Sequence, residues 1–448
     1  MLKEKLRKIL AAIAVVFWLR GPYIQIFLLG ALYSSYVQNT LILELVNNTF
    51  SRYFETVLHK YFWQHLLLGI GGIFSGILLH ALDTRKSLLY CGVFLFLYSG
   101  SHLSYTFFGY KEIVLFGYLF SSLGNSLLWT TVGTMLTTYP TEGQLGKVIA
   151  LFFTVVNTVK LACLFLPQSL MNSFDNQGNI KVSFWTYVFL GGIGLSTILS
   201  LIIASSKQVT RWNESKPRSL EKRTFKNYLT VVKRDLSSVE GALIIVTMFL
   251  WHMHHSSETG QELIKATRDL HYVEVCRGLF SIFFLFPFGF FLDTWFTRRT
   301  RGLLGLVVIT LLGTWILVYK SNLLSHLVDA PLYGKINGYF GILGAYSSLL
   351  SLYIIWIIGQ SSDDPLTVST YFGISKTFQV ICDVSIETYP SIVTYDVLNR
   401  SIFALLLICI YITLSYLTRS SQTYTQLPTD PALVESTTSL SEEGSNPV

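Results

Sequence analysis

The apolar residues of this chain gather in blocks of about twenty, which is the length that an α-helix needs to cross the hydrocarbon core of a bilayer. A soluble chain carries roughly a quarter charged residues. Here 51% of the residues are hydrophobic and only 13% are charged. The pattern therefore predicts an all-α, polytopic membrane protein whose main solvent is lipid.

The blocks predict twelve transmembrane helices in two sets of six. The first set is 22–45, 63–81, 87–107, 113–137, 147–166 and 183–205. The second set is 240–258, 272–295, 302–319, 336–360, 367–388 and 397–417. The chain then divides into an N-terminal segment (1–21), a first bundle (22–205), a polar linker (206–239), a second bundle (240–417) and a tail (418–448).

Basic residues are distributed unevenly between the loops. With the N-terminus in the cytoplasm, 20 of them fall on the cytoplasmic face, nine of these in the linker, and nine fall on the opposite face. Because cytoplasmic loops are enriched in Lys and Arg, this distribution predicts that both termini are cytoplasmic. The net charge of +7 then reflects topology, and nucleic acid is not an expected partner.

The ends of the chain and the first loop carry further signals. Residues 9–19 follow a basic start and are expected to form an interfacial helix, with a signal peptide as the alternative. Asn47 begins a sequon that the topology places in the first outer loop, where glycosylation would require it, although sequons also arise by chance. The tail, 418–448, is rich in Ser, Thr, Pro and Glu and is expected to be disordered.

The five cysteines all fall inside predicted spans, where a thiol behaves as a small apolar side chain. They are Cys91, Cys163, Cys276, Cys382 and Cys409. No CxxC pair occurs, and no disulfide framework is expected.

Two helix junctions, the second-to-third and the eighth-to-ninth, are similar at a shift of 213 residues. A glycine and two basic residues align in the two copies, Gly76, Arg85 and Lys86 in the first and Gly289, Arg298 and Arg299 in the second. The same shift carries the sixth span closely onto the twelfth. The repeat predicts two related six-helix halves.

A glycine followed by a polar residue and a basic pair resembles the cytoplasmic loop signature of the major facilitator superfamily. The glycine permits close helix packing, and the cations can pair with carboxylates or helix ends, so these loops are candidate latches between the halves. The second copy has Asp293 where the first has His80, and both lack the internal glycine of the signature. Topogenic charge alone is the alternative explanation.

Ionisable residues inside predicted spans are costly, and each therefore points to a cavity or a partner. One face of the eleventh helix carries four polar residues at spacings of 3, 4 and 4, namely Lys376, Gln379, Asp383 and Glu387. This stripe is expected to line a polar path or a proton-linked site, or alternatively to join two helices through an internal network. The shift of 213 residues carries Lys160 of the fifth helix to within one turn of Lys376. Asn39 of the first helix is expected either to line a cavity or to form a hydrogen bond between helices.

Two groups lie near the outer ends of the seventh and eighth helices. Glu274 and Arg277 are three residues apart and are expected to form a structural pair. Three histidines, His252, His254 and His255, suggest a metal site or a pH sensor, but they lack a known ligand spacing, so no metal is expected. Nucleotide-binding and HExxH motifs are missing from the sequence, so neither an enzyme nor a cofactor is expected.

Two stretches narrow the resemblance further. Residues 124–133 read Gly-Asn-Ser-Leu-Leu-Trp-Thr-Thr-Val-Gly, and 341–379 contain Gly341, Trp356 and the pair Lys376 and Gln379. In order and spacing they resemble the Unc-ninety-three-like family of the major facilitator superfamily, in which a lysine-glutamine pair matches these last two residues. The resemblance implies a major facilitator fold. It also implies, from some members, a role as a regulatory subunit of potassium channels or as a trafficking chaperone for receptors.

Two functions remain open. The first is a secondary transporter that moves a small solute by alternating access, with a midplane site built from the first, fourth, seventh and tenth helices and the eleventh-helix stripe nearby. The second is a non-transporting accessory protein that acts on a channel or receptor through its lipid-facing helices or tail. The basic latches and the intramembrane charges favour transport, whereas the incomplete loop signature favours the accessory role.

Overall fold

The computed structural model of the chain describes residues 21–51, 57–108, 111–165, 184–204, 208–209, 225–257, 270–293, 296–325, 333–362, 364–388 and 396–425. Within these ranges every regular element is a helix, which confirms the all-α prediction. The predicted interfacial helix at 9–19 lies outside the described residues.

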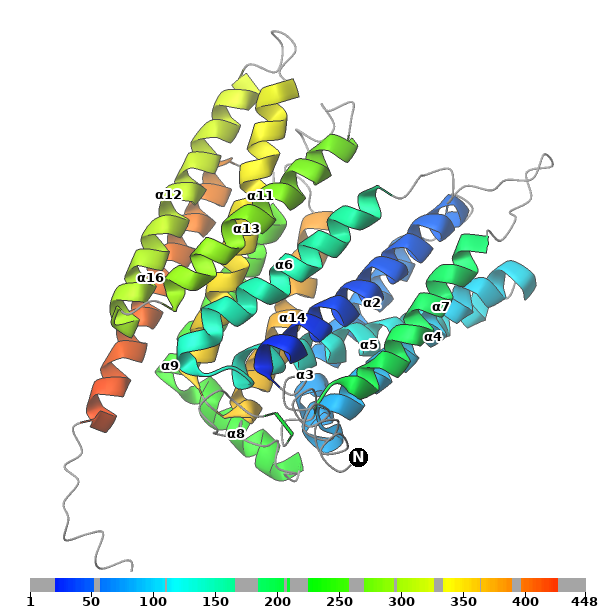
Figure 1. The fold of residues 1–448 in the computed structure, drawn as a ribbon, viewed down its shortest axis with the longest axis horizontal. Coiled ribbons are helices and arrows are strands. Elements are labelled where there is room, and N and C mark those ends of the chain that lie inside the picture. The colour runs from blue at the N-terminus through cyan, green and yellow to red at the C-terminus, as the bar shows by residue number, and fades with distance from the viewer. Residues whose placement is uncertain are drawn as a thin grey trace, which may run out of the picture.

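Among the described residues of the first half are six long helices, which together form the N-bundle (Figure 1). They are α2 (Pro22–Ser51), α3 (Val57–Leu82), α4 (Thr84–Phe108), α5 (Lys111–Thr138), α6 (Leu145–Leu164) and α7 (Phe184–Leu199), with short 3-10 turns at Glu142–Gln144 before α6 and Ser200–Ile202 after α7.

The described part of the second half contains six more long helices, which form the C-bundle. They are α9 (Val239–Ser257), α11 (Leu270–Leu292), α12 (Arg298–Ser325), α13 (Tyr333–Ser361), α14 (Pro365–Thr388) and α16 (Asp396–Thr425). These helices follow the sequence repeat in order: a shift of 213 carries α3 onto 270–295 and α4 onto 297–321, close to the observed α11 and α12.

Among the described residues, five helical segments are long and apolar enough to cross a bilayer on their own, at Glu142–Leu164, Tyr272–Leu292, Arg298–Leu323, Lys335–Ser361 and Leu398–Leu417. A sixth is added if the bent pair α8 and α9 counts as one span. Each predicted span coincides with an observed helix. The total of twelve spans stays a prediction.

The linker contains a helix that the sequence analysis did not predict. Helix α8 (Phe225–Ser237) precedes α9 and is bent by 86° from it, so that it lies crosswise beneath the two bundles (Figure 1). Its buried residues Tyr228 and Val231 pack with Leu366 of α14 and Ile77 of α3. Polarity averaged over the linker concealed this narrow apolar face. We call the end of the molecule that carries α8 the linker end, and the opposite end the far end.

The last helix also differs from expectation. Helix α16 continues to Thr425, so residues 418–425 are helical where the sequence predicted the start of a disordered tail. The apolar span inside it ends at Leu417, as predicted. A helix can outlast its apolar segment because its backbone hydrogen bonds are satisfied internally. The rest of the tail lies outside the described residues.

The two bundles meet along a seam where α6 packs against α11 and α3 packs against α14. Glycines line both contacts. A Cβ on Gly289 would lie 2.6 Å from the carbonyl oxygen of Gly146, and a Cβ on Gly72 would lie 2.7 Å from that of Gly373. Small residues let helices approach backbone to backbone, so few side chains lie between the helices at these two points.

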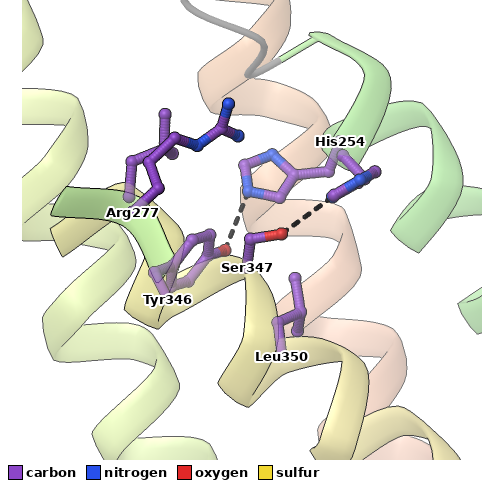
Figure 2. A pocket seen from close by; sticks show the side chains of 7 residues that line it. His254, Arg277, Tyr346, Ser347 and Leu350 are labelled. Atoms are coloured by element: carbon purple, nitrogen blue, oxygen red, sulfur yellow. Dashed lines mark hydrogen bonds between the residues drawn. The ribbon is translucent and has the colours of Figure 1, made fainter. Parts of the chain in front are cut away.

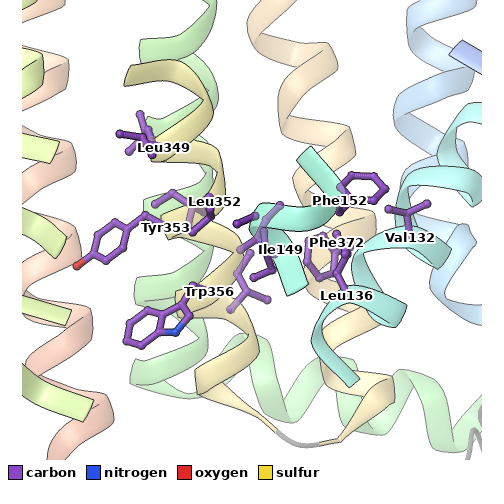
Figure 3. Packing of buried hydrophobic residues seen from close by; sticks show 14 of the residues in the cluster. Val132, Leu136, Ile149, Phe152, Leu349, Leu352, Tyr353, Trp356 and Phe372 are labelled. Carbon is purple, nitrogen blue, oxygen red and sulfur yellow. The ribbon is translucent and has the colours of Figure 1, made fainter. Parts of the chain in front are cut away.

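The apolar core is continuous across this seam. Figure 3 shows part of it, with side chains from α5, α6, α13 and α14, namely Val132, Leu136, Ile149, Phe152, Leu349, Leu352, Tyr353, Trp356 and Phe372. Trp129 of α5 meets Phe372 of α14 edge to face, with ring centroids 6.3 Å apart. The two stretches that carry the family resemblance, 124–133 and 371–379, therefore touch each other across the seam.

Candidate functional site

The second loop copy joins the two bundles at the linker end. The Asp293 carboxylate follows α11 and accepts hydrogen bonds from the backbone N–H groups of Gly146 (2.9 Å) and Lys147 (2.7 Å) at the start of α6. A carboxylate at a helix N-terminus satisfies otherwise unpaired donors and complements the helix dipole. Burial raises the pKa of this carboxyl, and the two amides partly offset the effect. We call this contact the Asp293 cap.

The basic residues of the same loop support the cap unequally. Arg298 donates to the carbonyl of Gln360 at the end of α13, and its Nε lies 3.5 Å from a carboxylate oxygen of Glu142 in the other bundle. Arg301, which the sequence analysis did not select, is buried and donates to the carbonyl of Leu292 at 3.0 Å. Arg299 is exposed and forms no ion pair within the described part of the chain.

The first loop copy is built differently. Its glycine, Gly76, lies against the Tyr228 hydroxyl of α8 and Ser369 of α14. Asp83 has a φ of 68°, a left-handed conformation that favours glycine and that aspartate tolerates better than most residues. For Arg85 and Lys86 no ion pair is found among the described side chains. The proposed latch therefore has its polar contacts in the second copy.

The polar stripe of α14 divides between two neighbours. The Lys376 ammonium donates to Gln379 Oε1 at 3.0 Å, within the same helix. The Asp383 carboxylate accepts a 2.6 Å hydrogen bond from Ser256 Oγ of α9. These contacts agree with the expected face of α14. The side chains of Glu387 and of the further candidates Asn39 and Asn47 lie outside the described residues, although the backbone of α2 remains helical through Asn47.

The three histidines of α9 point to three different partners. His252 Nε2 lies 2.8 Å from Ser375 Oγ of α14, His254 Nε2 lies 2.8 Å from the Tyr346 hydroxyl, and His255 Nδ1 lies 3.2 Å from Ser347 Oγ, both on α13. Among the described residues no cluster of three or more His, Cys, Asp or Glu is arranged to hold a metal ion. The five thiols are free. The histidines serve as polar contacts between helices.

Two of these histidines line a pocket of about 50 Å³ between α9, α11 and α13 (Figure 2). The lining residues are His254, His255, Arg277, Leu343, Tyr346, Ser347 and Leu350. The charged residues near His255 are Arg277 and Asp383. The His255 side chain is also partly exposed at the surface of the protein. We call this space the α9–α13 pocket.

An ion-pair cluster borders the pocket and crosses the seam. Glu274 of α11 accepts from Arg277 Nη1 at 3.0 Å, as its spacing predicted, and also from Lys160 Nζ of α6 at 3.0 Å. Lys160 therefore links the two bundles. Its partner Glu274 lies 114 residues away along the chain, and this pairing was not predicted from the sequence. The pocket residues Tyr346 and Ser347 were also missed, because a tyrosine and a serine in a span carry no distinctive signal.

Comparisons with known proteins agree with this architecture. No protein-family model matches the chain. The transporter FucP of the major facilitator superfamily, in a crystal structure of its outward conformation, superposes with a TM-score of 0.65 at 14% identity and covers 88% of this chain and 98% of its own. The human organic anion transporter MFSD10 superposes with a TM-score of 0.60 at 9% identity, covering 88% and 99%. The chain is thus a multi-pass membrane protein with the major facilitator fold.

Its relatives by sequence are UNC93-like proteins, which confirms the predicted family resemblance. UNC93-like protein 1 of Arabidopsis thaliana is 23% identical over 335 residues, which cover 69% of this chain and 70% of that protein. An UNC93-like protein of Schizosaccharomyces pombe is 24% identical over 338 residues, covering 69% and 64%.

Proposed function

We propose that this protein is a secondary transporter that moves a small solute across the bilayer by alternating access. The observation that carries the proposal is an ionisable cluster shared by both bundles, Lys160 with Glu274 and Arg277, beside an accessible pocket. Charged groups inside a span are costly unless they line a cavity or pair with one another; here Arg277 lines the pocket, and all three residues form ion pairs. The fold and the relatives point to a transporter or an accessory role rather than to an enzyme.

The construction of the seam supports a moving interface. Glycine contacts such as Gly146 with Gly289 place backbone against backbone, so few side chains must repack when the two helices slide or separate. The Asp293 cap and the Arg298 contacts are hydrogen bonds and an ion pair, which water can replace when the linker end opens. We infer that the structure represents a state closed at the linker end, with the α9–α13 pocket reached from the far end.

The stripe of α14 supplies the second part of the proposed path. Lys376 has only the neutral Gln379 amide as a partner within hydrogen-bond distance among the described side chains. Asp383 is tied to α9 through Ser256. Helices α9 and α14 therefore share polar contacts along one face, and the solute path is proposed to follow this face between the bundles. The basic linker end is proposed to face the cytoplasm, together with both termini.

Uptake into reconstituted vesicles tests the proposal. Purified full-length chain would be supplied in turn with labelled carboxylates, phosphate, sugars, amino acids and organic cations, and compared with Lys376→Ala. We expect at least one solute to enter, and we expect Lys376→Ala to reduce its uptake by about tenfold or more. Lys335→Gln, which removes an exposed cation at the start of α13, is the matched control and should transport normally.

The accessory function would be favoured by a different result. In that case no solute enters the vesicles although the protein is folded, and one channel or receptor copurifies with it. Uptake that is unchanged in Lys376→Ala would leave the transport proposal standing and remove this lysine from the path.

A further inference from the structure

The charges around Glu274 do not balance. This single carboxylate is shared by two cations, Lys160 Nζ and Arg277 Nη1, each at 3.0 Å. Lysine and arginine side chains are both protonated at neutral pH, so the cluster carries a net charge of about +1. A surplus positive charge beside a pocket attracts an anion supplied from outside the chain.

The second described carboxylate of this region does not offset the charge. Asp383 accepts the Ser256 hydroxyl at 2.6 Å and lies two helical turns from Lys376, whose ammonium has no carboxylate within ion-pair distance among the described side chains. Asp383 and Lys376 together are neutral. The excess positive charge therefore stays beside Arg277, where that side chain borders the α9–α13 pocket.

The lining of this pocket suits an oxyanion. It contains a guanidinium, two imidazoles and two hydroxyls, and none of its seven residues is a carboxylate (Figure 2). When Ser347 donates to His255 Nδ1, the ring proton lies on Nε2, which can then donate to a ligand. Arg277 has five N–H donors and uses one of them on Glu274. Several donors therefore converge in a lining without a carboxylate, and the nearest carboxylates are Glu274, which pairs with Arg277, and Asp383, which lies near His255.

The volume limits what enters the pocket. About 50 Å³ is roughly the room of one or two water molecules, which fits a carboxylate or another compact oxyanion group but not a whole sugar or amino acid. The leucines Leu343 and Leu350 complete the lining with apolar surface. A solute with an anionic head in the pocket would extend its remaining atoms toward the exposed side of His255.

We propose that the α9–α13 pocket binds the oxyanion group of an organic or inorganic anion, with Arg277 and His255 as the principal donors. The inference rests on the proposed transport function and names its substrate class. Binding would also affect the seam: an anion on Arg277 competes with Glu274, which then relies on Lys160 of the other bundle. The pairing of α6 with α11 strengthens, so occupancy of the pocket favours closure at its own end.

The test measures binding by the purified full-length protein in lipid nanodiscs, with acetate, succinate and phosphate as probes. Glucose and choline serve as the neutral and cationic comparisons. We expect saturable binding of at least one anion and of neither comparison compound. Arg277→Gln should weaken it by about tenfold or more, the usual effect of losing a charge-assisted contact. Lys335→Gln, a cation on α13 outside the pocket, should change affinity less than about twofold.

Glu274→Gln provides a result that a folding defect cannot imitate. It removes the competing carboxylate and leaves Lys160 and Arg277 in place, so anion affinity should rise by about tenfold. Preference for acetate and succinate, or for phosphate, identifies the type of oxyanion. Binding of glucose or choline that is insensitive to Arg277→Gln, or weaker anion binding in Glu274→Gln, would overturn the assignment. If the protein takes up a neutral solute and Arg277→Gln takes it up at the same rate, this inference fails and the transport proposal stands. If anions bind but no solute is taken up, the transport proposal fails and this inference stands.

Discussion

The Asp293 carboxylate of the C-bundle accepts a 2.7 Å hydrogen bond from the backbone N–H of Lys147, in the first turn of α6 of the N-bundle. Together with the bond from Gly146, this contact makes one bundle supply the helix cap of the other. A helix that begins against its neighbour in this way keeps its first N–H groups paired only while the linker end is closed.

Replacing Asp293 with alanine should therefore open the linker end. The variant leaves two N–H groups of α6 without their acceptors, which costs about 1–3 kcal/mol in the closed state. Asn keeps one acceptor oxygen, so Asp293→Asn should have a smaller effect. The opening is measured in Gln144→Cys, in a background without the native cysteines, as the rate at which the new thiol reacts with a water-soluble maleimide. Equal rates in wild type and Asp293→Ala would contradict the role of the cap.

The same carboxyl predicts a dependence on pH. Burial raises its pKa in the closed state, whereas in an open, solvated state the pKa would be ordinary. Protonation therefore favours the closed state, and this contribution is lost as the pH rises through the raised pKa. The rate of maleimide labelling should fall as the pH falls toward the raised pKa. The rate is first divided by that of the unfolded protein at the same pH, which corrects for the pH dependence of thiolate reactivity. In Asp293→Asn this trend should disappear, and its persistence there would assign it to another group.

Glycine contacts at the seam predict a steric effect. A Cβ on Gly289 would lie 2.5 Å from the Ala150 Cβ, so Gly289→Ala must push α11 away from α6, at a cost of about 1–3 kcal/mol. Gly100 of α4 has open space around its Cβ position, and Gly100→Ala is the matched control. Thermal unfolding in detergent should show a lower Tm for the first variant only. A loss of equal size in both would contradict the steric role of the seam, because helix propensity alone favours alanine over glycine.

Helix α8 packs across the contact between α3 and α14, and we expect it to hold these two helices together. The Tyr228 hydroxyl lies beside Gly76 of the N-bundle, while its neighbours Val231 and Leu366 form a small cluster with the C-bundle. Tyr228→Ala should release α8 and speed its proteolysis by about a hundredfold or more, since a buried aromatic side chain contributes about 3–5 kcal/mol. The next residue, Leu229, is exposed, so Leu229→Ala should leave the rate of proteolysis unchanged. Similar cleavage of the two variants would show that α8 is not held by this tyrosine.

Much of the architecture could be predicted because hydropathy reports directly on each helix. The observed bounds of α3, α5 and α14 lie within a few residues of the predicted spans, apart from the start of α3. Helix α8 escaped prediction because its apolar face is too narrow to raise the hydropathy of a basic linker. The extension of α16 beyond 417 escaped because polar helices and disordered tails share a composition.

The site was predicted only in part, for a different reason. The stripe of α14 and the pairing of Glu274 with Arg277 follow from spacing within one helix, which the sequence displays. The contacts of Lys160 with Glu274 and of His254 with Tyr346 join residues 114 and 92 positions apart. Such pairs depend on which helix faces meet, and a single sequence does not encode that in any local pattern. The histidines suggested a metal site because they are close in sequence, although they contact three different residues, one on α14 and two on α13.

The most direct test of alternating access is a reversible lock on the seam. The Thr377 hydroxyl of α14 donates to the carbonyl of Gly69 on α3 at 2.8 Å, and a Cβ on Gly69 would lie 3.8 Å from the Thr377 methyl group. The Thr377 Cβ lies more than 4 Å from the same position, near the upper end of the range of about 3.5–4.5 Å between the Cβ atoms of a disulfide, so Gly69→Cys with Thr377→Cys should crosslink on oxidation.

Uptake by this double variant, in a background without the five native cysteines, would be measured before and after reduction. If transport requires the bundles to move against each other, the oxidised protein should take up no solute and the reduced protein should recover. The two single variants should transport equally in both conditions. Solute uptake at the same rate in the crosslinked and the reduced double variant would contradict the account.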